Sequence, residues 1–307
     1  MKGLELAERY WNEVGAPALE AACPEAFGAL AVGLVGEGSE CLGYDDGISR
    51  DHDWGPGFCV WLTREGMERF GPALQRAYQS LPPEFLGWRR LRESEMSAGR
   101  VGVFEIGAFY QRFLGRREPP KDEVQWFALP DQALNVCTNG KVFLDREGAF
   151  TAFREVLLGY YPEDVRRKKL AAQCALAAQS GQYNYVRCLR RGERVAAMQA
   201  LAAFIDHAQA AIFLLDRRYR PYYKWAHRAL GEGSAQARAA AARMTRMAEG
   251  DPGAQEEEIE ALSADIIQGL KEQGLTGSGS DFLLDHAQEI QRGIRSPVLR
   301  GLPLMAG

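Results

Sequence analysis

The sequence predicts an α+β protein in which a small mixed sheet with helices is followed by an α-helical bundle. Short apolar runs alternate with helical patterns up to about residue 150. From Phe150 onward nearly every segment has helical spacing, and the short connections favour an antiparallel bundle. The chain has 307 residues, 46% of them hydrophobic and 25% charged, which allows one large or two modest domains, and the change in pattern near residue 150 favours two. We therefore predict domains at residues 1–150 and 151–307.

The first half reads as helix, strand, loop, strand, helix, strand, an order that suits a small sheet backed by helices. Residues 27–35 are apolar without alternation, the pattern of a fully buried strand. Thr63 is suited to cap the helix after the second strand, and Pro82-Pro83 ends that helix. The predicted helices are 4–13, 16–22, 64–81, 109–114 and 130–139, and the predicted strands are 27–35, 58–62, 100–106 and 141–144.

The second half consists of amphipathic segments with short connections between them. The predicted helices are 165–178, 183–189, 195–215, 235–247, 256–273 and 282–292. A Gly-Ser loop at residues 274–280 precedes the last of them. We expect the tail after Ser296 to be poorly ordered unless it docks.

The composition argues against several classes of protein. A net charge of -4 gives no basic field that would hold a long nucleic acid. The six cysteines lack Cys-x-x-Cys spacing, so we expect no zinc site and we expect the protein to lie in a reducing compartment. Residues 196–215 contain Gln199, Asp206, His207 and Gln209 and are too polar for a membrane span. Because the N-terminus lacks the apolar core of a signal peptide, we predict a soluble cytoplasmic protein without a membrane partner.

The stretch that carries chemistry follows the first predicted strand. Gly38-Ser39 lies where that strand ends, so backbone N–H groups and the serine hydroxyl could cradle phosphate oxygens. Asp51 and Asp53 are separated by one residue, and such residues of a strand point to the same face. Two carboxylates on one face suit Mg²⁺, which also binds substrate phosphates. The sequence thus predicts a metal site at Asp51 and Asp53 beside a phosphate cradle at Gly38 and Ser39.

This arrangement resembles the signature of the polymerase-beta-like nucleotidyltransferase superfamily, in which an apolar strand, Gly-Gly or Gly-Ser, about ten residues and Asp-x-Asp follow in order. The matching parts here are Gly38-Ser39, the spacer 40–50, and Asp51-His52-Asp53. Members of the superfamily usually add a third carboxylate from a later strand. By that resemblance Glu105, on the predicted third strand, is the best candidate for the base that takes the acceptor proton.

Other loop residues have simpler expected roles. Asp45 and Asp46 are expected to cap turns rather than bind metal, and Asp145 to cap the helix that follows it. Arg50 is adjacent to Asp51, and it could contact a phosphate or pair with a loop aspartate.

Two clusters in the helical half mix cations with aromatic residues, a combination that can stack a base and bind phosphates. They are Tyr183-Asn184-Tyr185 with Arg187, and Pro221-Tyr222-Tyr223-Lys224-Trp225. Tyrosines packed between helices with solvated arginines are the alternative. With the Gly-Ser-Glu and Asp-His-Asp segments, the clusters resemble a bacterial family of nucleotidyltransferase-like proteins. That family is distantly similar to the aminoglycoside nucleotidyltransferases. The resemblance makes Lys224 a candidate phosphate contact, and Arg187 is expected to act with it.

The leading prediction is an Mg²⁺-dependent enzyme that moves a nucleoside monophosphate, most simply AMP from ATP, to a hydroxyl of a small-molecule acceptor. A nucleotide-binding or regulatory module without turnover is the first alternative, and it depends on whether the third carboxylate is present. Transfer of the nucleotide to a protein partner is the second. The sequence specifies neither the acceptor nor the oligomeric state.

Overall fold

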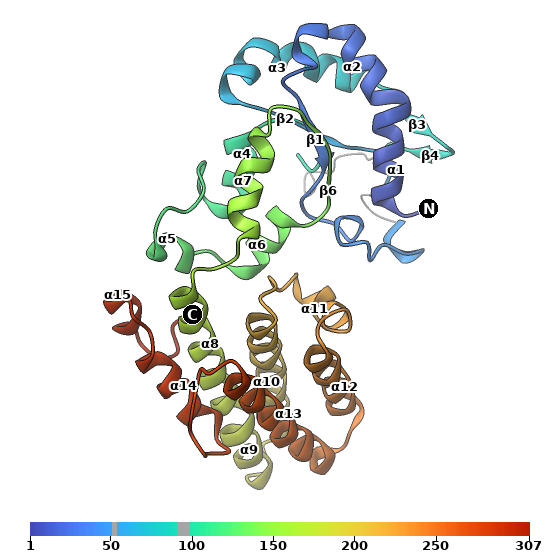
Figure 1. The fold of residues 1–307 in the computed structure, drawn as a ribbon. Coiled ribbons are helices and arrows are strands. Elements are labelled where there is room, and N and C mark those ends of the chain that lie inside the picture. The colour runs from blue at the N-terminus through green and yellow to red at the C-terminus, as the bar shows by residue number, and fades with distance from the viewer. Residues whose placement is uncertain (51–53, 91–98) are drawn as a thin grey trace. The chain divides into compact units, whose positions relative to one another are not determined.

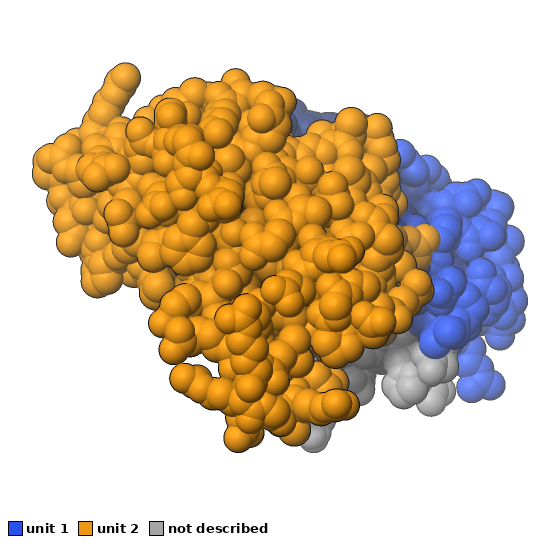
Figure 2. All heavy atoms as spheres, turned by 90° about the horizontal axis from the view of Figure 1, so that it is seen from below, with its two compact units in different colours: residues 1–119, 133–159 blue, residues 120–132, 160–307 orange. Residues whose placement is uncertain are grey.

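The computed structural model describes residues 1–50, 54–90 and 99–307. Asp51 and Asp53 therefore lie outside the described residues. The chain divides into two compact units, which Figure 2 colours separately: unit 1 comprises residues 1–119 and 133–159, and unit 2 comprises residues 120–132 and 160–307. Unit 1 contains a small mixed sheet and unit 2 is helical, so the predicted α+β class is confirmed.

Unit 1 combines a four-stranded sheet with helices and a short hairpin (Figure 1). Its strands are β1 (Ala31–Leu34), β2 (Cys59–Leu62), β5 (Gly102–Glu105) and β6 (Lys141–Asp145), with the hairpin β3 (Glu84–Phe85) and β4 (Trp88–Arg89). Its helices are α1 (Gly3–Tyr10), α2 (Ala16–Ala22), α3 (Arg64–Gln79), α4 (Ile106–Leu114) and α7 (Ala149–Leu158), together with a π-helical turn at Trp11–Gly15 and 3-10 turns at Pro24–Ala26, Glu40–Leu42 and Ile48–Arg50. Helix α6 (Asp131–Thr138) begins at the unit boundary.

The strand order of the sheet is β5-β2-β1-β6. Strand β1 is antiparallel to both β2 and β6, whereas β2 and β5 are parallel. In this register Gly33 lies opposite Cys59, and Leu62 lies opposite Glu105. The carboxyl end of β1 therefore lies beside the amino ends of β2 and β5, which fixes the end of the sheet at which any site after β1 must lie.

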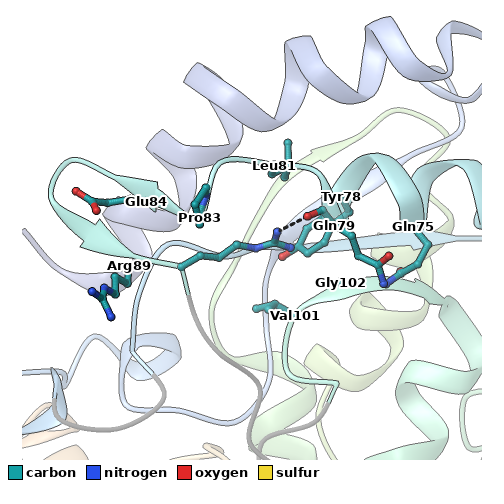
Figure 3. Close-up of a pocket in the computed structure, with 10 residues that line it drawn as sticks. Gln75, Tyr78, Gln79, Leu81, Pro83, Glu84, Arg89, Val101 and Gly102 are labelled. Atoms are coloured by element: carbon teal, nitrogen blue, oxygen red, sulfur yellow. Dashed lines mark hydrogen bonds between the residues drawn. The ribbon is translucent and has the colours of Figure 1, made fainter.

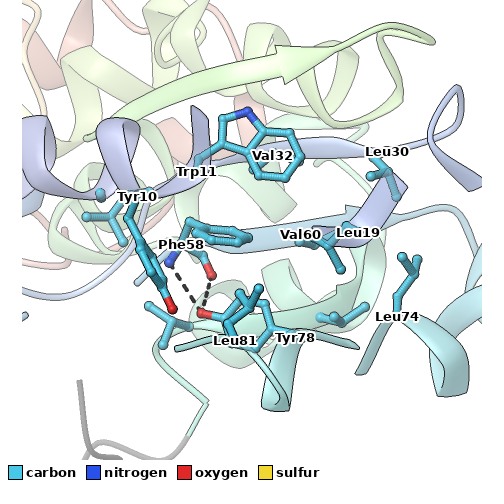
Figure 4. Close-up of a cluster of buried hydrophobic side chains, with 14 of the residues drawn as sticks. Tyr10, Trp11, Leu19, Leu30, Val32, Phe58, Val60, Leu74, Tyr78 and Leu81 are labelled. Carbon is cyan, nitrogen blue, oxygen red and sulfur yellow. Dashed lines mark hydrogen bonds between the residues drawn. The ribbon is translucent and has the colours of Figure 1, made fainter. Parts of the chain in front are cut away.

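The core of unit 1 lies between the sheet and the helices of the N-terminal half (Figure 4). Phe58 packs against Tyr10, Trp11 and Tyr78 with ring centroids 5.0–5.7 Å apart. The hydroxyl of Tyr78 donates to the carbonyl of Phe58 at 2.8 Å and accepts from its backbone N–H at 3.3 Å. Thr63 caps α3 by accepting from the N–H of Gly66, as its position predicts. Burial of these aromatic groups stabilises the unit and ties α3 to the start of β2.

The predicted boundary near residue 150 differs from the division in the structure, because α7 belongs to unit 1. Phe150 stacks on Trp61 of β2 with centroids 3.9 Å apart, and Phe153 stacks on Tyr110 of α4 at 3.7 Å. All four rings are buried. Helical spacing identifies the apolar face of α7 but not the surface that it packs against, which explains the difference.

Unit 2 is built from helices around α8 (Glu163–Ala177) and α10 (Arg194–Leu215). The other helices are α5 (Glu123–Phe127), a π-helix at Ala178–Tyr185, α9 (Val186–Arg190), α11 (Tyr223–Leu230), α12 (Ala235–Glu249), α13 (Pro252–Glu272), α14 (Leu283–Arg292) and α15 (Pro297–Arg300). By length and composition α10 alone in the described residues could cross a membrane, and half of its most apolar window is buried inside the protein.

The C-terminal tail of unit 2 is docked. The buried ammonium group of Lys168 donates to the carbonyls of Leu304 and Ala306 at 2.9 and 2.6 Å. Ser296 caps the short helix α15 and its N–H donates to Asp164 at 2.7 Å. These polar contacts to α8 order a segment whose own sequence predicts no order.

Phe150→Ala should lower the free energy of unfolding by about 3–5 kcal/mol, because it removes a fully buried ring and leaves a cavity against Trp61. Hydrogen exchange should accelerate in β2 and α4 and not in α12 or α13. Val156→Ala, at a side chain of α7 that is 42% exposed, is the control and should cost about 0.5 kcal/mol or less. Faster exchange confined to unit 2 would contradict the placement of α7.

Candidate functional site

The turn after β1 needs glycine at two positions. Gly36 has φ of 137° and Gly38 has φ of 121°, a region that other residues rarely adopt. A Cβ atom at Gly38 would also lie 2.1 Å from Nη2 of Arg100 and 2.5 Å from a carboxylate oxygen of Glu40. Ser39 begins the 3-10 turn at Glu40–Leu42, and its side chain does not cap that turn. The chain thus bends sharply where β1 ends, at the predicted phosphate cradle.

Asn139 and Gly140, which directly precede β6, hold the turn in place. The side chain of Asn139 accepts from the N–H of Gly36 at 3.0 Å and donates to its carbonyl at 2.8 Å. The N–H of Gly140 donates to the carbonyl of Cys41 at 2.8 Å. Both polar groups of Gly36 are therefore satisfied by one amide, which fixes the beginning of the turn.

Arg100 holds the other side of the turn. Its guanidinium group pairs with the carboxylate of Glu40 and donates to the carbonyl of Glu37 at 3.0 Å. Glu40 is 7% exposed, and this burial raises its pKa while Arg100 partly offsets the effect. Since Arg100 directly precedes the segment that leads into β5, the pair connects the turn with the start of that strand.

The loop beyond the turn is anchored through Asp45. This aspartate is buried, and its Oδ2 accepts from the N–H of Gly3 at 2.8 Å and from Nε1 of Trp54 at 3.1 Å. Its Oδ1 has no hydrogen bond within the described part of the chain and lies 3.9 Å from Nζ of Lys2. Asp45 therefore joins three segments rather than capping a turn, which corrects that prediction.

Two other predictions for acidic residues are confirmed. Asp46 caps the turn at residues 46–49, because its Oδ1 accepts from the N–H groups of Ile48 and Ser49 at 3.0 Å each. Asp145 caps α7, because it accepts from the N–H groups of Gly148 and Thr151 at 3.0 and 2.7 Å.

Arg50 is stacked on aromatic rings, and no loop aspartate within the described ranges pairs with it. Its guanidinium carbon lies 5.1 Å from the ring centroid of Trp54 and 4.9 Å from that of Trp88. Its Nη2 also lies 3.4 Å from the carbonyl of Met1. The two indoles account for the position of this side chain without a phosphate.

Glu105 does not lie at the turn, which corrects the prediction of a third carboxylate there. It is the last residue of β5 and lies opposite Leu62, at the end of the sheet away from the turn. Its carboxylate caps α4 by accepting from the N–H groups of Gly107 and Ala108 at 2.9 and 2.6 Å, and it pairs with Arg117. Parallel pairing of β5 with β2 carries it to this end, because parallel strands share their carboxyl edge.

A cavity of about 420 Å³ lies near the start of β5, at the same end of the sheet as the turn (Figure 3). It is bounded by Gln75 and Tyr78 of α3, by Arg90 after the hairpin, and by Val101 and Gly102. The guanidinium of Arg90 lies over the Tyr78 ring at 4.3 Å. Strands β5 and β1 are separated by β2, so the cavity lies about 10 Å to the side of the turn along the sheet edge.

The structure does not bring Arg187 and Lys224 together. Arg187 lies on α9, just before the amino end of α10, whereas Lys224 lies on α11, which follows its carboxyl end. Helix α10 has 22 residues and is about 33 Å long, and the helices α9 and α11, which carry the two cations, lie at opposite ends of it (Figure 1). Both are exposed, over the rings of Tyr183 and Trp225 respectively. They cannot bind one triphosphate together.

Sequence reasoning missed Glu40, Arg100 and Asn139 as residues that shape the turn. The Asn139-Gly140 pair before β6 is a turn signal, so its position in a loop could have been found. Arg100 has no local signal, because its partners lie about 60 positions earlier. Among residues 1–50, 54–90 and 99–307 no three metal-binding side chains cluster.

Comparison with known proteins gives three findings. Residues 126–226 match the domain of unknown function DUF4037. No curated protein matches the chain. The crystal structure of a nucleotidyltransferase-like protein from Exiguobacterium sibiricum 255-15 is similar at 12% identity and a TM-score of 0.38, over 91% of this chain and 81% of that chain. The DUF4037 segment includes both tyrosine-rich clusters of the helical half.

Asn139→Ala should destabilise the turn by about 1–3 kcal/mol, because both polar groups of Gly36 lose their partner. Urea unfolding measures the loss, and hydrogen exchange should accelerate at residues 35–41. The control Asn12→Ala, at an exposed amide, should change the free energy of unfolding by about 0.5 kcal/mol or less. Unchanged exchange at the turn would show that Asn139 does not hold it.

The free energy of unfolding of the Glu40→Gln variant, relative to that of the wild type, should rise as the pH rises. Because burial raises the pKa of Glu40, the folded protein keeps this proton at a pH where the unfolded chain has lost it. The wild type therefore loses stability over that range, and the variant, which cannot ionise at this position, does not. Urea unfolding of both proteins between about pH 4 and pH 7 measures this difference. The opposite slope would show that the charge of Arg100 outweighs burial.

Proposed function

We propose that the protein is a nucleotidyltransferase that uses Mg²⁺ and ATP to move AMP to a hydroxyl of a small-molecule acceptor. The observation that carries the proposal is the glycine turn at Gly36–Ser39, which ends a strand that pairs with β2. Asp51 and Asp53 precede β2 in the sequence by a few residues. The turn thus follows β1, and Asp51 and Asp53 come before its neighbour β2 in the sequence.

The turn suits the phosphate part of a nucleotide. Gly38 and Ser39 are partly exposed, and the Ser39 hydroxyl is not used to cap the turn. Arg100 neutralises the carboxylate of Glu40 beside Gly38, which lowers the repulsion that an incoming phosphate would meet. Backbone N–H groups in a glycine-rich turn then offer donors to phosphate oxygens. The cavity of about 420 Å³ at the same sheet edge has room for a nucleoside.

The reaction forms a bond between the acceptor oxygen and the α-phosphorus and breaks the bond from that phosphorus to the bridging oxygen. Pyrophosphate leaves with the electron pair of the broken bond, and the acceptor hydroxyl loses its proton. Glu105 is not placed to take that proton, because it caps α4 at the other end of the sheet. The role of base is therefore left to a group other than Glu105.

The donor set suits Mg²⁺. Carboxylate oxygens are the ligands this ion prefers, and Asp51 and Asp53 would hold it. Oδ1 of Asp45, buried and without a hydrogen bond in the described ranges, is a further oxygen of this kind in the same loop. When bound, the ion would neutralise charge on the phosphates.

A nucleotide-binding module without turnover is the second candidate, and the position of Glu105 favours it. The described carboxylates at the turn and in the loop after it include Glu37, Glu40 and Asp45, and of these Glu40 and Oδ2 of Asp45 are engaged in structural contacts. Such a protein would bind ATP and release no pyrophosphate.

Asp51→Ala and Asp53→Ala should each lower the rate of pyrophosphate release by about 100-fold or more, because each removes a ligand of the metal. The assay combines ATP, Mg²⁺ and a library of small molecules that carry hydroxyl groups. Candidate protein acceptors are tested by measuring whether their intact mass increases by one added nucleotide.

Asp281→Ala, at an exposed aspartate of unit 2, is the matched control and should leave the rate unchanged. Normal turnover in either test variant would refute the metal assignment. ATP binding by calorimetry without pyrophosphate release from any acceptor would favour the binding module.

A further inference from the structure

Unit 2 contains a second cavity, of about 350 Å³, which the transfer proposal does not use. Its wall comes from the segment that leads into α6, from α8, from α10, from the loop after α10 and from Gly307 of the docked tail. The polar residues that line it are Asp131, Lys169, Gln173 and Arg220, and Phe127 and Leu214 are among the apolar ones. It lies almost entirely within the DUF4037 segment.

Lys169 is the cation of this cavity that forms no close ion pair with a described residue, although the carboxylate of Asp131 attracts it from a longer distance and partly offsets the effect of burial on its pKa. Its Nζ lies 5.2 Å from the ring centroid of Phe127 and 5.3 Å from that of Tyr161. Among the residues that the structure describes, none forms a hydrogen bond or an ion pair with it. Its neighbours differ: Arg166 and Arg167 pair with Glu163, and Lys168 donates to two carbonyls. Burial accordingly lowers the pKa of Lys169 to about 8.

The one side-chain carboxylate among the residues that line the cavity, Asp131, is already used. Oδ1 of Asp131 accepts from the N–H of Gln132 at 3.0 Å, and Oδ2 lies 3.3 Å from Nε of Arg220. Arg220 also donates through Nη1 to the carboxylate of Asp206 at 2.7 Å. Asp131 is therefore held by Gln132 and by the charge of Arg220, and it forms no hydrogen bond or close ion pair with Lys169.

Two further donors line the cavity. The Nε–H of Arg220 is buried and makes no hydrogen bond within the described ranges, despite the nearby Oδ2. Nδ1 of His207 forms a hydrogen bond with Oε1 of Gln173 at 2.9 Å. The amide nitrogen of Gln173 is therefore the group that remains for a ligand. The lining side chains thus present donors at Lys169, Arg220 and Gln173 against one carboxylate, Asp131, so the complementary ligand is an anion.

We infer that this cavity binds a small organic anion whose carboxylate or phosphate group pairs with Lys169 while its apolar body packs on Phe127 and Leu214. A volume of about 350 Å³ fits a ligand of this size. The inference does not depend on the transfer reaction, because it concerns contacts within unit 2 alone.

The test measures binding of benzoate, phenyl phosphate and neutral benzamide to the full chain by calorimetry and ligand-observed NMR. At least one of the two anions should bind more tightly than benzamide, and the tighter one identifies the carboxylate or the phosphate class. Lys169→Met should weaken that binding by about tenfold or more, because the ion pair is lost. The variant should fold, since Lys169 leaves no hydrogen-bonding partner unsatisfied.

A second variant tests the cavity without touching the charge. Ala210→Met adds volume at a lining residue and should also weaken binding by about tenfold or more. Lys271→Met, at an exposed lysine of α13, is the control and should bind as the wild type does. Failure of both anions to bind, equal binding of benzamide, or unchanged binding in both lining variants would overturn the inference.

Discussion

The pairing of β1 with β2 and β6 is the constraint on which the candidate site depends. Because both neighbours are antiparallel to β1, the turn that follows β1 meets the start of β2 and the segment that leads into β6. From that segment Asn139 binds Gly36, and from the segment before β5 Arg100 binds Glu37 and Glu40. Neither of these polar contacts would form if β1 were parallel to its neighbours.

The turn illustrates how a polar loop can be ordered at a sheet edge. Its glycines allow a backbone path that other residues would strain, and its polar groups are satisfied from segments distant in sequence. A buried glutamate beside such a turn would be costly without a cation, and Arg100 supplies one. The rigidity that results is what a phosphate-binding loop requires, since ordering it during binding would cost affinity.

Unit 2 differs from unit 1 in how its buried charges are paired. Around the turn of unit 1 each buried charge that the structure describes has a partner, except for one oxygen of Asp45. In the helical unit Lys169 lies beside two aromatic rings, forms no close ion pair with a described residue, and is attracted by Asp131 only from a longer distance. Cation–π contacts compensate only part of the hydration that a buried ammonium group loses, and the lowered pKa of Lys169 reflects that deficit. Burying the ammonium group of Lys169 in this way costs stability, and the proposed anionic ligand would offset that cost when bound.

The sequence by itself determined the α+β class, the cap at Thr63, the caps formed by Asp46 and Asp145, and the glycine-rich turn after the first strand. These features depend on neighbours within a few positions, where local propensity and hydrogen bonding decide the outcome. The tertiary structure alone decided that α7 packs on the sheet and that Glu105 lies away from the turn. It also decided that α10 separates Arg187 from Lys224 and that Arg100 reaches Glu40. Each of these depends on strand direction or on which surface an apolar face meets, and a pattern of residues along one segment does not specify either.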